Sequence, residues 1–159
     1  MTVPTDVASM AGTGIYARES SYLESYVQIG MAGERLISVD FPDEPDAEAT
    51  PDHGLLDRIF AYLEGVNDDF ADVEIGLTVS TEHRAVLETV REIPYGEQVT
   101  VEAVVRMTPQ VEGDEGEATV RSALADNPLP LVVPDHRVRD GPSGAPPEIE
   151  QRLRSLEGL

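Results

Sequence analysis

The chain has 159 residues, with 31 Asp or Glu against 11 Arg, no Lys and no Cys, and its formal net charge is −20. The absence of Cys excludes a disulfide scaffold, a Cys-ligated zinc site and a cysteine nucleophile. No apolar run approaches the roughly 20 residues of a membrane helix and no secretory signal is visible, so we expect a cytoplasmic protein without a membrane partner. The three His residues lie too far apart for a helical metal pair, and we predict no metal and no cofactor.

The strong acidic excess, combined with the absence of Lys, is typical of cytoplasmic proteins from halophiles. At about 1 M salt the Debye length is roughly 3 Å, so the self-repulsion of such a chain is largely screened. Net charge is therefore a weak argument against a polyanionic partner here. The excess is also uneven, because residues 1–79 hold 16 acids and 3 Arg whereas residues 80–159 hold 15 acids and 8 Arg. From Ala118 to the end the chain holds 6 acids and 5 Arg, so this least acidic segment would tolerate a polyanion best, unless its Arg residues only form a solvated face.

A β-hairpin is predicted early in the chain. The first 13 residues are polar and predict no element, and the pattern becomes strand-like from Tyr22. Residues 35–41 alternate apolar with polar side chains, which is typical of a half-buried strand. A Gly-containing turn at 31–34 joins the two runs. Residues 42–52 hold three Pro and five acids, and we expect a solvated loop.

The next elements mix helices with extended segments. Residues 55–63 carry apolar side chains at a spacing of three to four and predict a helix that ends at Gly65. Residues 73–77 predict a short strand. A second helix, capped by Ser80 or Thr81, follows and extends toward Ile93.

The last part of the chain is predicted to be mainly helical. Thr100 can cap a helix at 101–107, and a second helix is expected at 118–126. Residues 131–133 are expected to form a buried extended run, and Pro146-Pro147 is expected to begin the final helix. Strands followed by helices predict an α+β protein. We expect an N-terminal unit at 1–79, with a small antiparallel sheet and a helix, and a helical unit at 80–159.

Three motifs in the second half carry a family resemblance. They are Ile93-Pro94-Tyr95-Gly96, Asn127-Pro128, and Pro134-Asp135-His136-Arg137-Val138. Their order and spacing resemble the IPYG, NP and PCHRV motifs of the alkylguanine-DNA alkyltransferases, also called methylated-DNA–protein-cysteine methyltransferases. The resemblance covers residues 22–159. It implies an RNase H-like N-terminal domain, a winged helix-turn-helix-like C-terminal domain, double-stranded DNA as partner and a monomer in DNA repair. Together with the composition, it predicts a haloarchaeal, alkyltransferase-like member that lacks the family cysteine.

The resemblance also implies a reaction site in which one residue is replaced. In the family, a cysteine thiolate takes the alkyl group from a flipped-out guanine, a His activates the thiol, and a Glu orients the His. The matching residues here are His136 and Glu157, with Asn127 at the position of a structural Asn. Asp135 stands where the cysteine belongs. A carboxylate is a far poorer nucleophile toward such a carbon, so cysteine alkylation is chemically impossible for this chain.

The DNA-contacting positions implied by the resemblance are also altered. Val101 stands in place of a Tyr that assists the departure of guanine, and Ala118 in place of the Arg that fills the gap left by the flipped base. Arg121 lies one helical turn further and could take that role, or it could form a salt bridge with a neighbouring acid. Arg121 and Ser122 match the small, Gly-type positions that let the recognition helix approach DNA closely. The stretch after the PxHRV motif is short, so the family's Gly-rich pocket loop is largely missing.

Two further Arg residues, Arg137 and Arg139, follow the His of the motif. Either they contact DNA, or Arg137 holds the structure by hydrogen bonds. Likewise, Asp135 is either a relic of the site or a residue kept to bond nearby backbone N–H groups.

Three functions remain open from the sequence. The first is a non-catalytic alkyltransferase-like protein that binds DNA, at alkylated guanine or otherwise. The second is a structural or interaction protein that kept the fold and lost DNA binding. The third is an enzyme that uses Asp135 with His136.

Overall fold

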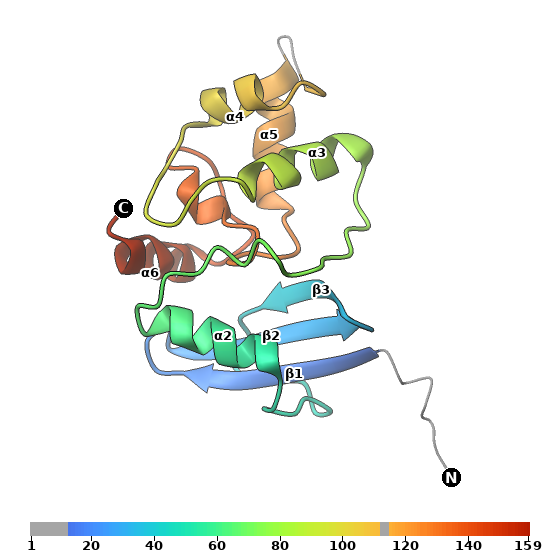
Figure 1. The fold of residues 1–159 in the computed structure, drawn as a ribbon, viewed down its shortest axis with the longest axis vertical. Coiled ribbons are helices and arrows are strands. Elements are labelled where there is room, and N and C mark those ends of the chain that lie inside the picture. Colours follow the sequence, from blue (N-terminus) through green and yellow to red (C-terminus); the bar gives the residue numbers. More distant parts are fainter. Residues whose placement is uncertain (1–12, 112–114) are drawn as a thin grey trace.

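The computed structural model describes residues 13–111 and 115–159. A small antiparallel sheet with helix α2 against one face forms one part of the molecule, and the remaining helices lie beyond the β3 edge of the sheet (Figure 1). In chain order the elements are β1 (Thr13–Ser20), β2 (Ser25–Ala32), β3 (Arg35–Asp40), α2 (Gly54–Leu63), α3 (Thr81–Val90), α4 (Val101–Met107), α5 (Gly116–Ala125), the 3-10 turn η2 (Asp135–Arg137) and α6 (Pro147–Glu157). The predicted α+β class, with a small antiparallel sheet and several helices, is confirmed.

The sheet has the order β1-β2-β3 and contains the predicted hairpin. Strands β2 and β3 pair antiparallel around a turn in which Gly33 has φ = 65°, a conformation that favours Gly. Strand β1 was not predicted. It pairs with β2 over its whole length, from Thr13↔Ala32 to Ser20↔Ser25. Its sequence signal is weak because polar residues fill its second half, so its stability comes from pairing rather than from an amphipathic pattern.

The strand predicted at 73–77 is wrong. Ile75 makes a single parallel bridge to Leu36, supported by the bonds from Leu36 N to Glu74 O and from Gly76 N to Leu36 O. Further along β3, the N–H of Val39 donates to the carbonyl oxygen of Pro128 instead. The free edge of β3 is therefore shared between two segments, and neither extends into a full strand.

The helices follow the predicted caps. Ser80 accepts a hydrogen bond from His83 N at the start of α3, and Thr100 accepts one from Ala103 N at the start of α4. Helix α2 is capped by His53, whose Nδ1 accepts from Leu55 N. Helix α3 ends near residue 90, three residues before the predicted stop, although Ile93 remains buried.

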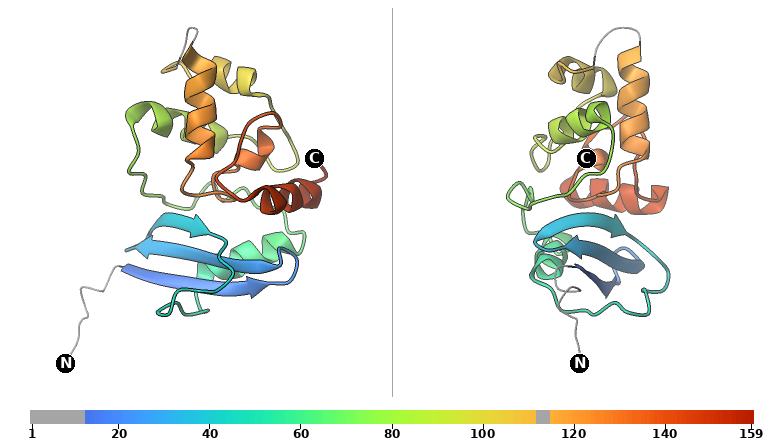
Figure 2. Two further views of the ribbon diagram at one scale, coloured as in Figure 1. Left: turned by 180° about the vertical axis from the view of Figure 1, so that it is seen from behind. Right: turned by 90° about the vertical axis from the view of Figure 1, so that its right-hand side faces the viewer.

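The two parts of the molecule share one apolar core. Its members come from β2, β3, α2 and all the later helices. Helix α6 lies between the sheet and helices α3 to α5, as the two turned views show (Figure 2). Tyr22, which precedes β2, donates to the carbonyl oxygen of Arg152 in α6, and Arg152 donates to the carbonyl oxygen of Leu23. Within the described ranges, no helix is long and apolar enough to cross a bilayer.

Candidate functional site

The three sequence motifs converge on the short turn η2. Asp135, His136 and Arg137 are all buried, with exposed fractions of 0%, 0% and 2%. The end of the turn is anchored to Val99, because Val99 N donates to Arg137 O and Arg139 N donates to Val99 O. Glu157, the last residue of α6, reaches the same place. The structure therefore brings together the residues that the resemblance implied as a site.

Glu157 is the centre of a buried hydrogen-bond network. Its carboxylate accepts from His136 Nε2 at 2.7 Å, from Arg137 Nε at 2.8 Å and Nη2 at 3.0 Å, and from Gly96 N at 3.0 Å. The hydroxyl of Tyr62, which comes from α2, donates to the same carboxylate. Burial alone would raise the pKa of Glu157, but the hydrogen bonds from His136 and Arg137 outweigh it and hold this pKa well below its usual range.

Arg137 is fully engaged inside the protein. Besides Glu157, its guanidinium donates to the carbonyl oxygen of Ile93 at 2.7 Å and to Asp69 Oδ1 at 3.2 Å. Asp69 in turn accepts from Tyr95 N, so Arg137 ties the IPYG turn to the segment before α3. This placement favours the structural alternative for Arg137. Val101 is also buried, at 1% exposed, and neither side chain is available to DNA in this structure.

Asp135, at the position of the family cysteine, is occupied by hydrogen bonds. Its Oδ1 accepts from Ser143 Oγ at 2.6 Å, and its Oδ2 accepts from Gly144 N at 2.8 Å and from Asn127 Nδ2 at 2.9 Å. Burial raises the pKa of this carboxyl above its ordinary value, although the three hydrogen bonds act in the opposite direction. The bond from Gly144 N is the backbone contact expected if Asp135 is retained for packing.

His136 has one engaged ring nitrogen. Nε2 lies against Glu157, while Nδ1 has no hydrogen-bond partner within the described part of the chain. The carboxylate of Asp135 is bonded to Asn127, Ser143 and Gly144 rather than to His136. The pair therefore lacks the nucleophile–base contact that covalent catalysis requires.

Four of the predicted DNA-contacting residues are exposed. Ala118, Arg121 and Ser122 lie on the outer side of α5, and Arg139 lies in the turn after η2. Arg121 Nη1 donates to the carbonyl oxygen of Asp140 at 2.9 Å, which holds its guanidinium beside that turn. We call these four residues the α5 face. A groove of about 290 Å³ borders the face and is lined by Arg139, Gly141, Pro147, Glu150, Gln151 and Arg154.

Several residues of the network were not predicted from the sequence. Tyr62 continues the apolar stripe of α2 and gives no polar signal, and Asp69 lies in an acidic loop among similar residues. Ser143 and Gly144 belong to the short stretch after the PxHRV motif. Only the fold shows that Ser143 and Gly144 lie within hydrogen-bonding distance of the Asp135 carboxyl group.

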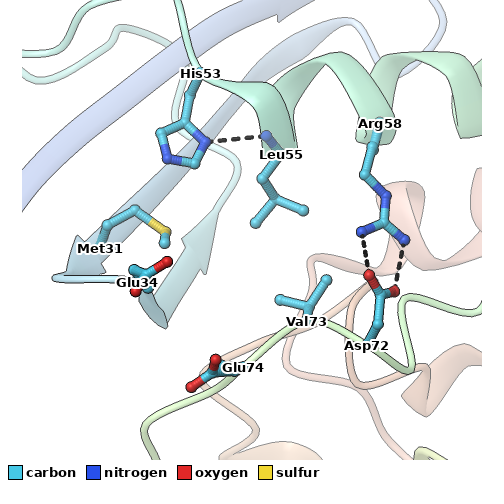
Figure 3. Close-up of a pocket in the computed structure, with 8 residues that line it drawn as sticks. All are labelled: Met31, Glu34, His53, Leu55, Arg58, Asp72, Val73 and Glu74. Atoms are coloured by element: carbon cyan, nitrogen blue, oxygen red, sulfur yellow. Dashed lines mark hydrogen bonds and ion pairs between the residues drawn. The ribbon is translucent and has the colours of Figure 1, made fainter.

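A separate pocket of about 250 Å³ lies between α2, the β2–β3 turn and residues 72–74 (Figure 3). Its charged side chains are partly paired with one another. Arg58 bonds both oxygens of Asp72, and His53 is used as the cap of α2. In the portion of the chain that the structure describes, no group of three His, Asp or Glu residues is arranged to hold a metal ion.

Comparisons with known proteins agree on one family. The family described as "6-O-methylguanine DNA methyltransferase, DNA binding domain" matches residues 81–157. A methylated-DNA–protein-cysteine methyltransferase from Methanopyrus kandleri is 36% identical over 130 residues, which cover 77% of this chain and 93% of that protein. One from Metallosphaera sedula is 28% identical over 153 residues, covering 89% and 93%.

Solved structures show the same fold. The Mycobacterium tuberculosis O6-methylguanine methyltransferase superposes with a TM-score of 0.70 at 22% identity, over 91% of this chain and 90% of that one. The structure of Mycobacterium tuberculosis OGT in complex with DNA gives a TM-score of 0.69 at 23% identity, over 92% and 91%. By its sequence similarity over most of its length, the chain belongs to the methylated-DNA–protein-cysteine methyltransferase family, and it contains no cysteine.

Proposed function

We propose that this protein is a non-catalytic member of its family that binds double-stranded DNA in DNA repair and transfers no alkyl group. The observation that carries the proposal is the contrast between the two halves of the site. The α5 face remains exposed, with Arg121 oriented by Asp140, whereas residue 135 is an enclosed carboxylate. The chain would act as a monomer in the cytoplasm, with α4 and α5 as a helix-turn-helix-like pair and with domains at 1–79 and 80–159.

Family likeness supports DNA as the partner. The matched family is a DNA-binding domain, and one structural neighbour was solved in complex with DNA. A chain of net charge −20 can neutralise few phosphates, so the salt dependence should be shallow compared with the slope of about −0.9 per phosphate contact. Hydrogen bonding and shape would supply most of the affinity.

Replacing Arg121 should weaken DNA binding. We expect Arg121→Ala to weaken the binding of a duplex by about 1–3 kcal/mol, because a specific contact is lost. Fluorescence anisotropy in molar KCl measures this effect. Arg35→Ala is the matched control, since it removes the same charge from an exposed position on β3. If the Arg121 and Arg35 variants bind the duplex with equal affinity, α5 does not contribute to the DNA interface.

The wild-type chain should acquire no alkyl group from DNA. After incubation with a duplex that contains O6-methylguanine, intact mass spectrometry should show the unmodified protein mass. Asp135→Cys should not restore full activity, because Val101 and Ala118 also depart from the family. A stoichiometric gain of one methyl group by the wild-type chain would overturn the non-catalytic assignment and favour the enzyme alternative.

A further inference from the structure

We propose that Asp135 is a latch that closes the 143–145 turn over the family's reaction position. The protein would then bind duplex DNA without extruding a base and without distinguishing alkylated guanine from guanine. This inference rests on the proposed DNA binding. It adds a statement about specificity, namely that alkylated guanine is not preferred over guanine. It narrows the sequence-based hypothesis, which left recognition of alkylated guanine open.

The latch consists of the three hydrogen bonds that Asp135 accepts. Ser143 Oγ and Gly144 N belong to the turn, and their bonds to the carboxylate are 2.6 and 2.8 Å long. Ser143 Oγ also accepts from Ala145 N at 3.0 Å, which shapes the turn itself. Two hydrogen bonds from adjacent residues of the turn therefore hold it against residue 135.

The third bond connects the latch to the end of the α5 segment. Asn127 Nδ2 donates both to Asp135 Oδ2 and to the carbonyl oxygen of Val133, and Asn127 Oδ1 accepts from Leu129 N. Asn127 follows α5 by two residues. The latch is therefore connected through Asn127 to the segment that follows α5.

Packing leaves no room for a base beside residue 135. The side chain of Asp135 is 0% exposed and Ala145 is 7% exposed. Gly144 packs so closely on Asn127 that a Cβ at position 144 would collide with the Asn127 carbonyl oxygen, so the turn also lies tightly against the segment after α5. A reacting atom must approach its partner to about 3–3.5 Å. An extruded base could reach that distance only if the turn moved away and its two bonds to Asp135, from Ser143 Oγ and Gly144 N, broke.

Two matched duplexes test the consequence for DNA. One contains O6-methylguanine and the other guanine at the same position, and both are titrated with the wild-type chain in molar KCl. We expect their dissociation constants to agree within about twofold, a difference well below 1 kcal/mol on the usual conversion. A duplex with 2-aminopurine at that position should keep its quenched fluorescence, with the single strand defining the unstacked signal.

The outcomes separate this inference from the proposed function. A preference of about tenfold or more for the methylated duplex, or a rise of 2-aminopurine fluorescence toward the single-strand level, would overturn the closed site while leaving DNA binding intact. If neither duplex binds, the proposed function fails, and the statement about base extrusion fails with it.

Hydrogen exchange tests the latch without DNA. Gly144 is an exposed residue, yet its N–H is bonded to Asp135, so its amide should exchange slowly in the free protein. Asp135→Asn keeps an oxygen acceptor and should preserve this protection. Asp135→Ala should speed the exchange by about tenfold or more, as loss of the partner predicts. If the Gly144 amide of the wild-type chain exchanges as fast as an unbonded amide, there is no latch, whatever the variants do.

Discussion

Glu157→Gln will lower the free energy of unfolding by about 3–5 kcal/mol, because removing one partner of a buried ion pair leaves the other charge uncompensated. Glu157 is the acceptor for both Arg137 and His136, and Arg137 is only 2% exposed. The amide of Gln would also point a donor at groups that are themselves donors. Urea unfolding in molar KCl, followed by circular dichroism, measures the loss. Glu97→Gln, an exposed neighbour of the IPYG motif, is the control and should change stability by less than about 0.5 kcal/mol.

The same prediction has a defined pH dependence. The pKa of Glu157 is lowered in the folded protein, so its stabilising contribution is complete above the ordinary value of 4.5 and is lost as the pH falls from there toward the folded pKa. The stability gap between the wild-type chain and Glu157→Gln should therefore narrow below pH 4.5. A gap that is small at neutral pH, or that widens in acid, would mean that the network does not depend on an ionised Glu157.

Asp135→Ala should lower the stability of the protein, whereas Asp135→Asn should not. Ala leaves the donors of Asn127, Ser143 and Gly144 without their partner, and we expect a loss of about 2–3 kcal/mol. Asn can keep all three contacts, since its oxygen can accept from Asn127 and Gly144 while its amide donates to Ser143 Oγ. Asp135→Asn should therefore match or exceed the stability of the wild-type chain at neutral pH.

The pKa of Asp135 determines how the stability difference between Asp135→Asn and the wild-type chain changes with pH. Burial raises this pKa in the folded protein, so the acid contributes its full stability below the ordinary value of 3.8 and loses it as the pH rises through the folded pKa. Asn has no such loss, so the stability of Asp135→Asn relative to wild type should increase from acid to neutral pH. Equal destabilisation by Ala and Asn would show that the hydrogen bonds of residue 135 do not hold the turn.

The sequence predicted those parts of the fold that depend on local patterns. Helices α3 and α4 follow from apolar spacing and from the caps Ser80 and Thr100, and the β2–β3 hairpin follows from alternation around Gly33. Strand β1 escaped prediction because Arg18 and Glu19 interrupt its alternation, so that its pairing with β2 determines its structure. The error at 73–77 has a similar origin, since competition for the edge of β3 is a tertiary effect.

Only those residues of the site that belong to, or match, the family motifs could be predicted from the sequence. The resemblance identified His136 and Glu157 as partners, and the structure places their atoms 2.7 Å apart. Tyr62 bonds Glu157, which lies 95 residues later in the chain, and Asp69 bonds Arg137, which lies 68 residues later. Nothing in the local sequence of Tyr62 or Asp69 distinguishes them from core and loop residues. The enclosed state of Asp135 depends on how the 143–145 turn folds back, which no local pattern encodes.

A titration of a fluorescent duplex with the wild-type chain, in molar KCl at neutral pH, tests most directly whether this cysteine-free family member still binds DNA. We expect saturable binding in the micromolar range or tighter, weakened by Arg121→Ala and unchanged by Arg35→Ala. Circular dichroism of the same sample shows that the chain is folded. A folded chain that leaves the anisotropy of every duplex unchanged at micromolar protein would contradict DNA binding and favour a structural or interaction role for the retained fold.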